Sequence, residues 1–272
     1  MSGDEEPEIC AFPSVLSESG GLFMVFEMWS VGHFLYMLSP FVIFALLYIF
    51  AIRGKSERVR DTVSLILGIL SLLILTVRNA DIFLRSGWDL EIIPLQVCHV
   101  GNIVTGFALL LKKRWLLITS FCFNMMPAFL AMIFADSLAN YDTLLAIRPQ
   151  SYIWGHIVIV VIALWGIAAY RPIPTRGDVV LSLSLISGIL VAAIVCNSAL
   201  RLIDGWAPNY FYLYDYKGTP LRFLYDPFPT LNIGWFSINP VYVAVLVAVF
   251  IALYFALLYL VKLYGGHAKK PN

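Results

Sequence analysis

Long, continuously apolar runs fill most of the chain, and short polar stretches separate them. Seven of these runs reach the roughly 20 residues that an α-helix needs to cross a bilayer. The strands of a membrane β-barrel would instead alternate apolar and polar positions over about ten residues. We therefore predict an all-α polytopic membrane protein with seven transmembrane helices, near residues 33–52, 62–84, 94–111, 115–134, 152–170, 179–203 and 241–264.

The composition agrees with a membrane protein and excludes several other classes. Apolar residues make up 60% of the chain and charged residues only 13%, whereas a soluble domain carries about 25% charged residues. A net charge of +1 provides no basic field for nucleic acid, so we expect no nucleic-acid partner. The four cysteines show neither a CxxC motif nor the spacing of metal ligands, and we expect no metal and no cofactor. They are Cys10, Cys98, Cys122 and Cys196.

The basic residues predict the orientation in the membrane. Twelve of the 18 Lys and Arg residues follow the first, third, fifth and seventh predicted helices, and four lie on the opposite side. Basic connections face the cytoplasm. We therefore expect an extracytoplasmic N-terminal tail at 1–32, a single membrane domain at 33–264 and a cytoplasmic tail at 265–272. In a bacterium, such a multi-pass protein would lie in the plasma membrane.

The connection at 204–240 is the longest of the predicted loops. It contains five Pro, three Gly and many Tyr, Phe and Trp residues. Aromatic side chains favour the bilayer interface, and a loop of this length is usually functional. We expect an extracytoplasmic cap over the mouth of the bundle. An interfacial loop that takes no part in chemistry is the alternative.

Polar and ionisable residues gather at one depth, near the extracytoplasmic ends of the predicted helices. Such groups are costly inside a membrane and often mark a functional site. His33 begins the first helix at this level. The other members are Arg78, Asn79 and Asp81, then Gln96, Cys98, His99 and Asn102, then His156, and finally Asn197, Arg201 and Asp204.

The two arginines of this cluster allow two interpretations. A buried Arg is costly unless it is paired, and Asp81 and Asp204 stand nearest in sequence to Arg78 and Arg201. Such ion pairs would fasten the ends of helices. Either guanidinium would equally suit the phosphate of a lipid head group.

Cys98 and His156 form the candidate catalytic pair. A thiolate is a nucleophile, and a His within hydrogen-bond reach can take the thiol proton. A Cys in a membrane helix is more often an inert packing residue, as we expect for Cys122 and Cys196. His156 has a similar alternative as a hydrogen-bonded residue at a helix end. His33 is a second-rank candidate for the same site.

Three segments around these residues resemble a known family. They are WDLEIIPLQVCHV (88–100), SYIWGHIVIVVIALWGI (151–167) and APNYFYLY (207–214). The segments are similar to the YwaF-like integral membrane family of bacteria and to its animal relative, the transmembrane acyltransferase that makes polyunsaturated ether phospholipids. The resemblance covers residues 62–260. Cys98, His99 and His156 match the Cys-His and the later His of the animal relative.

The resemblance implies acyl transfer between lipids through a thioester on Cys98. His156 would exchange protons with the thiol and with the accepting hydroxyl. The expected partners are therefore phospholipid and lysophospholipid at the outer leaflet. YwaF-like proteins often carry a His two residues before the Cys, and this chain has Gln96 there instead.

Further roles follow for the polar residues around the candidate pair. The oxyanion of the reaction needs a hydrogen-bond donor, for which the candidates are Gln96, His99 and Asn102. The head group would be held by Arg78, Arg201, Asn209 and Tyr210. The supporting residues would be Asp81, Asp204 and His33.

Three other functions use the same polar cluster. A lipid acyl hydrolase would pass the acyl chain to water from the same dyad. A lipid or small-molecule transporter would use the cluster as a binding site, although no repeat is visible in the chain. A seven-helix receptor or sensor would also place its N-terminus outside.

Overall fold

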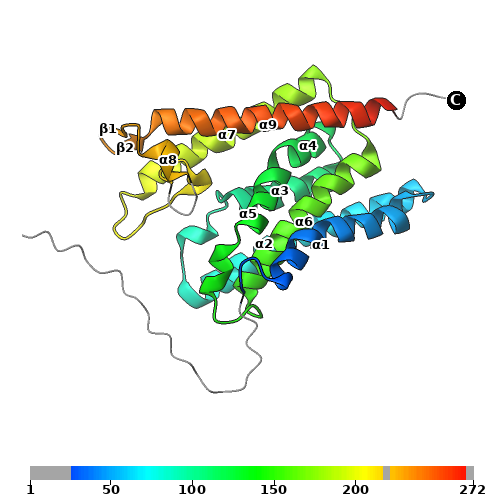
Figure 1. Ribbon diagram of the computed structural model, residues 1–272, viewed down its shortest axis with the longest axis horizontal. Coiled ribbons are helices and arrows are strands. Elements are labelled where there is room, and N and C mark those ends of the chain that lie inside the picture. The colour runs from blue at the N-terminus through cyan, green and yellow to red at the C-terminus, as the bar shows by residue number, and fades with distance from the viewer. Residues whose placement is uncertain (1–25, 217–220, 268–272) are drawn as a thin grey trace, which may run out of the picture.

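The computed structural model describes residues 26–216 and 221–267. Within these ranges the chain forms seven apolar helical segments long enough to span a membrane, which confirms the predicted fold class (Figure 1). The predicted tails at 1–32 and 265–272 lie mostly outside the described residues. The long helices are α1 (Val31–Leu47) extended by η1 (Tyr48–Ile52), α2 (Glu57–Ser86), α3 (Val97–Leu111), α4 (Arg114–Thr119), α5 (Met125–Ile133), α6 (Ile147–Tyr170), α7 (Arg176–Leu200) and α9 (Pro240–His267).

The sequence predicts one regular helix over 115–134 for the fourth spanning segment, but the structure shows an interrupted one. A π-helical turn, η3 (Ser120–Asn124), separates α4 from α5. Pro127 follows in the first turn of α5. Because proline has no N–H group, it interrupts the regular ladder of hydrogen bonds, and the wider turn lies directly before this interruption.

Several helix boundaries differ from those of the predicted apolar runs. α2 and α6 each start five residues earlier than the runs at 62 and 152, and α7 ends at Leu200 rather than at 203. α3 and α6 end on Lys112 and Arg171, both in the left-handed conformation, with φ of 50° and 43°. Glycine usually occupies such a position. A basic side chain there interacts favourably with the C-terminal end of the helix dipole.

Helix α6 lies at the centre of the bundle and is the most buried of the seven segments. It packs against α1, α2, α3 and α5, whereas α7 contacts α4, and α9 contacts η3. Glycines allow α2 and α3 to approach closely. A Cβ on Gly106 would stand 2.9 Å from Leu72 Cγ and 3.1 Å from the carbonyl oxygen of Gly68. Small residues of this kind bring helix backbones together in membrane bundles.

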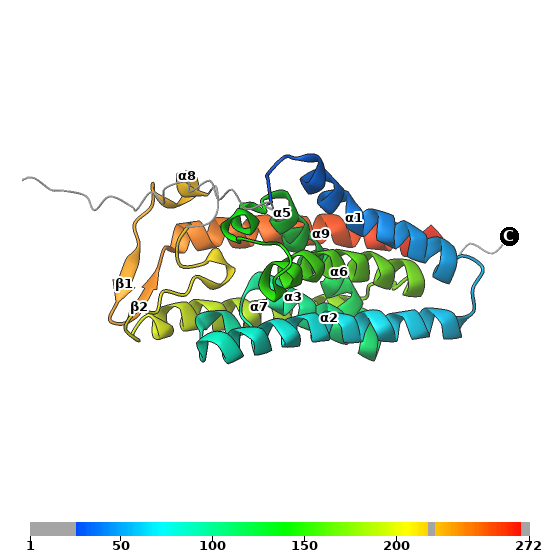
Figure 2. The same cartoon turned by 90° about the horizontal axis from the view of Figure 1, so that it is seen from below.

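The two ends of the bundle differ in charge and in structure. One end, here called the basic end, contains the α1–α2 and α3–α4 junctions, the α6–α7 junction and the C-terminal part of α9 (Figure 2). Its described residues include ten Lys or Arg but only three acidic residues, Glu57, Asp61 and Asp178. The connection between α7 and α9 lies at the opposite end, here called the loop end (Figure 2).

The connection between α7 and α9 contains four short elements. They are the single turns η5 (Tyr210–Tyr212) and α8 (Arg222–Tyr225) and the antiparallel strands β1 (Leu231–Ile233) and β2 (Phe236–Ile238). The strands pair with Leu231 opposite Ile238. Tyr210, Phe211 and Leu213 are buried, so this part of the connection packs onto the bundle.

Candidate functional site

The candidate site lies at the loop end, where α2 ends and α3 begins. A 3₁₀ turn, η2 (Leu90–Ile92), joins the two helices. Arg78 pairs with Glu91 at 2.5 Å and also donates to the Glu91 carbonyl oxygen at 3.1 Å. Asn79 donates to the carbonyl oxygen of Ile92 at 3.2 Å. These contacts fasten η2 to the last turns of α2.

The predicted ion pairs of Arg78 with Asp81 and of Arg201 with Asp204 are not formed among the described residues. Asp81 pairs with Arg85 at 2.7 Å, one helical turn away, rather than with Arg78. Arg201 lies 3.9 Å from Asp215, and Asp204 is exposed. In both cases a residue of a connecting segment supplies the partner, because that segment folds back over the helix end.

Cys98 occupies the second position of α3 and is half-buried. The backbone N–H groups and the dipole of a helix N-terminus stabilise an anion such as a thiolate, whereas burial opposes it. Asn102 lies one turn further along. Its Nδ2 donates to the Cys98 carbonyl oxygen at 3.0 Å, and its Oδ1 accepts from Ser71 at 3.0 Å. The Asn102 amide is therefore used to join α3 to α2.

His156 is buried in α6, and a hydrogen bond orients its ring. Nδ1 lies 2.6 Å from the carbonyl oxygen of Tyr152, whose ring centroid is 4.2 Å from the imidazole centroid. Because a carbonyl oxygen only accepts, Nδ1 carries the proton and Nε2 of the neutral ring keeps its lone pair. A histidine in this tautomer is suited to act as a base through Nε2.

Cys98 and His156 lie at one helix crossing but share no hydrogen bond in the part of the chain that the structure describes. A Cβ on Gly155 would stand 3.3 Å from Asn102 Nδ2, so the residue before His156 meets the residue one turn after Cys98. His99, which follows Cys98, is buried and interacts electrostatically with His156.

Three tyrosines that were not predicted as site residues interact with Cys98. Tyr36 on α1, Tyr152 on α6 and Tyr212 in η5 all interact electrostatically with this thiol. The hydroxyl of Tyr36 is buried without a hydrogen-bond partner among the described residues. Tyr212 is partly exposed, but its hydroxyl is desolvated, which raises the pKa of Tyr212, and Cys98 and Asp136 add to this rise.

A cleft of about 470 Å³ opens beside this group. Its lining includes four residues that the sequence analysis assigned to the site, namely Gln96, Arg201, Asn209 and Tyr210. The remaining polar lining comes from Asp89, Glu91, Tyr212 and Asp215. Cys98 itself does not line the cleft, but Tyr212 belongs to both groups of residues and connects them.

Arg201 is the central cation of the cleft. Its Nη2 donates to the Pro208 carbonyl oxygen at 2.8 Å, and the guanidinium carbon stands 3.6 Å from the ring centroid of Tyr214. Nε is buried and has no hydrogen-bond partner in the described structure. An unpaired N–H of a guanidinium is suited to an anionic oxygen.

Asn209 and Tyr210 hold the loop in place. Asn209 Nδ2 donates to the Asp215 carboxylate at 2.8 Å within the loop. Tyr210 exchanges two backbone hydrogen bonds with the side chain of Asn197, at 2.6 and 3.0 Å, and its hydroxyl donates to the Leu90 carbonyl oxygen at 2.9 Å. Burial raises the pKa of Tyr210 to about 12, which keeps this donor protonated.

The backbone directly after Tyr210 is strained. Phe211 and Tyr212 both have positive φ values, 57° and 54°. The left-handed region is unfavourable for bulky residues and occurs mainly where the surrounding structure enforces it. Stacking of Phe211 on Phe123 of η3, at 6.3 Å between ring centroids, is one such contact.

The remaining candidates of the sequence analysis have structural contacts. His33 accepts from the Trp29 N–H at Nδ1 and donates from Nε2 to the Met132 carbonyl oxygen at 2.8 Å, which joins α1 to α5. Cys122 is buried, Cys196 is half-buried, and Cys10 lies outside the described residues. The described residues contain no group of three His, Cys, Asp or Glu side chains arranged to hold a metal ion.

Comparison with known proteins identifies the family. No curated protein and no solved structure matches the chain significantly. A sequence profile matches residues 28–259, which include the first six spanning segments completely and the seventh up to residue 259. This chain therefore belongs to the TMEM164 family.

Proposed function

We propose that this protein is a membrane phospholipid acyltransferase that carries the acyl chain as a thioester on Cys98. The observation that carries the proposal is the position of a half-buried thiol at the N-terminus of α3, one helix crossing from a histidine of defined tautomer. The resemblance of the segments around Cys98 and His156 to lipid acyltransferases supports the same chemistry.

The first half of the reaction forms the acyl-enzyme. Nε2 of His156 takes the proton of Cys98, and the thiolate attacks the carbonyl carbon of a phospholipid ester. The ester C–O bond breaks as the C–S bond is completed, and the lysophospholipid leaves with the proton from His156. Cys98 and His156 share no hydrogen bond in the free protein, so the two side chains must approach each other when substrate binds. Catalytic hydrogen bonds commonly shorten in this way.

The second half transfers the acyl chain to an acceptor. The hydroxyl of another lysophospholipid gives its proton to His156 and attacks the thioester, and the C–S bond breaks to restore the thiol. The developing oxyanion needs a donor in both halves. The hydroxyl of Tyr36 has no hydrogen-bond partner among the described residues and is free for this role, whereas the amide of Asn102 already bonds to Cys98 and Ser71.

The cleft beside the site suits the lipid head group. The buried Nε of Arg201 offers a donor to a phosphate oxygen, and the aromatic residues of the cleft suit the polar–apolar boundary of a bilayer. With the basic end in the cytoplasm, as the positive-inside rule requires, the cleft faces the outer leaflet. A multi-pass protein oriented in this way has access to lipids of that leaflet.

The test combines a nucleophile variant with a search for the covalent intermediate. Incubation of the purified protein with phospholipid should give an acyl adduct on Cys98, detected by mass spectrometry and released by hydroxylamine. Cys98→Ala should lose both adduct and turnover, whereas Cys122→Ala should retain them, because Cys122 is buried in packing contacts.

Loss of the base has a separate signature. His156→Ala should lower turnover by about 10²- to 10⁴-fold, as is typical when a general base is removed. Release of free fatty acid in place of transfer to added lysophospholipid would identify a hydrolase. Full turnover of a folded Cys98→Ala protein without any adduct would exclude the acyl-enzyme and favour a lipid transporter.

A further inference from the structure

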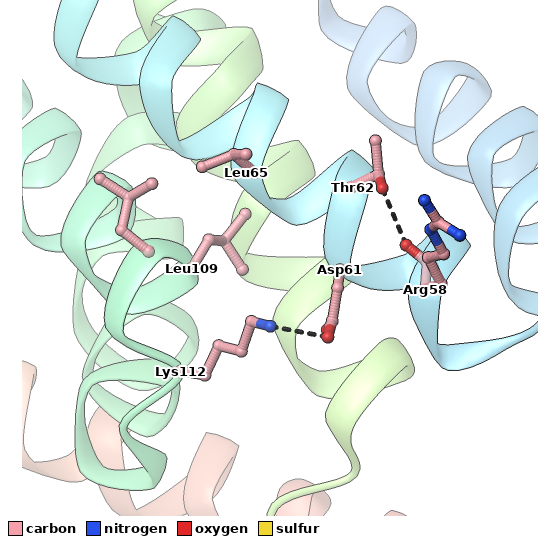
Figure 3. A pocket seen from close by; sticks show the side chains of 7 residues that line it. Arg58, Asp61, Thr62, Leu65, Leu109 and Lys112 are labelled. Carbon is pink, nitrogen blue, oxygen red and sulfur yellow. Dashed lines mark hydrogen bonds and ion pairs between the residues drawn. The ribbon is translucent and has the colours of Figure 1, made fainter.

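A second groove lies at the basic end, far from the candidate site along α2 and α3. It runs between the first turns of α2 and the last turn of α3 and has a volume of about 520 Å³ (Figure 3). Its wall carries the apolar side chains of Leu65, Leu109 and Leu110. Its polar lining consists of Thr62, the two basic residues Arg58 and Lys112, and one acidic residue, Asp61. An apolar wall with a net basic polar lining matches the shape and polarity of a lipid.

The packing of α2 and α3 explains why the groove exists. The two helices touch at Gly68 and Gly106, where a Cβ on Gly68 would stand 3.0 Å from the Gly106 carbonyl oxygen. This crossing closes the groove toward the middle of the bundle. At the basic end, α3 stops at Lys112, whose left-handed conformation turns the chain toward α4 and leaves the side of α2 uncovered.

The charges at this end are not balanced. Each of the three acidic residues already has a partner, because Glu57 pairs with Arg60, Asp61 with Lys112 and Asp178 with Arg114. Arg58 lines the groove, and its guanidinium makes no ion pair with any described residue. Lys112 has three donors, so it can bind a second oxygen while it keeps its 2.8 Å contact with Asp61 (Figure 3).

We propose that the groove binds one anionic phospholipid of the leaflet at the basic end. The phosphate lies between Arg58 and Lys112, and an acyl chain follows Leu65, Leu109 and Leu110 toward the Gly68–Gly106 crossing. Leu65 is 51% exposed, so this wall continues into the lipid-facing surface of α2. Basic pockets between transmembrane helices at the cytoplasmic face bind anionic head groups for the same reason.

The test measures lipid retention by the purified protein in native mass spectrometry. Phosphatidylglycerol and phosphatidylcholine with identical chains are compared, because they share the phosphate and differ in net charge. The wild-type protein should retain one phosphatidylglycerol more tightly than phosphatidylcholine. Arg58→Gln should weaken this retention about 5-fold, and the double variant Arg58→Gln with Lys112→Gln should weaken it about 10- to 30-fold. These factors correspond to roughly 1 kcal/mol for each basic residue near an anionic lipid.

The controls separate this effect from folding and from simple phosphate binding. Arg58 is exposed and unpaired, so the single variant should fold normally, and Arg222→Gln at the loop end should leave retention unchanged. Soluble glycerol phosphate should not displace the lipid if the acyl chain occupies the groove. Equal retention by wild type and both variants, equal retention of the two lipids, or displacement by glycerol phosphate would each overturn the proposal.

Discussion

Replacing Asn197 by Leu should release the long loop from the bundle. The Asn197 amide makes two hydrogen bonds to the backbone of Tyr210, at 2.6 and 3.0 Å, and both residues are almost fully buried. Leucine keeps the helix propensity and the approximate volume of the side chain, but it leaves the N–H group of Tyr210 without a partner. The Tyr210 carbonyl oxygen loses one of its two hydrogen bonds and keeps the one from the Leu213 N–H at 3.3 Å.

The size of the effect follows from these two groups. Leaving the buried N–H unsatisfied costs about 1–3 kcal/mol, and the lost hydrogen bond to the carbonyl adds about 0.5–1.5 kcal/mol, so the docked loop should lose roughly 1.5–4.5 kcal/mol relative to the open loop. Because every 1.4 kcal/mol is tenfold, even about 1.5 kcal/mol raises the open population about 12-fold. Local opening of this kind does not require the helices to separate.

Labelling of Cys98 reports the opening, because Tyr212 of the loop interacts electrostatically with this thiol. In a protein whose other cysteines are replaced by Ala, a membrane-impermeant maleimide should label Cys98 at least 10-fold faster when Asn197 is Leu. Asn232→Leu serves as the control, because Asn232 lies on the exposed strand β1. Equal labelling rates for wild type and the Asn197 variant would show that these hydrogen bonds do not hold the loop.

Three further predictions test the packing, the loop and the orientation. Gly106→Ala should lower the stability by about 1–3 kcal/mol in thermal unfolding, because its Cβ would meet Leu72 and the Gly68 carbonyl. Gly188→Ala should leave the stability unchanged, because Gly188 has open space around it. The pKa of Tyr210 is raised from the ordinary tyrosine value of about 10 to about 12. The protonated hydroxyl therefore contributes fully to stability below about pH 10, and this contribution is lost as the pH rises toward 12. The thermal stability of the wild type should therefore fall more steeply over this range than that of Tyr210→Phe. A reporter inserted at residue 55 should be cytoplasmic and one at residue 228 extracytoplasmic, and the reverse result would refute the assigned orientation.

The number of spanning helices was predictable because it depends on local composition. Each apolar run is long enough to identify a span without knowledge of its neighbours. The interruption at η3 was not predictable in the same way. The residues Ser120–Asn124 lie inside an apolar run whose composition does not distinguish a π-helical turn from regular helix, although Pro127 marks the place.

The candidate site was predictable only in part. Helix direction places Cys98 and His156 at one depth, and the structure brings their helices into contact. The partners of Arg78 and Arg201 come instead from η2 and from the loop, whose folds depend on tertiary contacts. Tyr152 was detectable, since it stands four residues before His156 and therefore on the same face of the helix.

The central position of α6 has a consequence for the order of assembly during synthesis. Helices α1, α2, α3 and α5 all pack against α6, but α6 begins only at Ile147 and is therefore synthesised after all four. The earlier helices must reach the membrane before their common partner is complete. Since domains assemble in the order in which they are made, the bundle closes around α6, and α7 and α9 join later through their contacts with α4 and η3. A nascent chain stalled before residue 147 would lack the helix that the core of the bundle is built around.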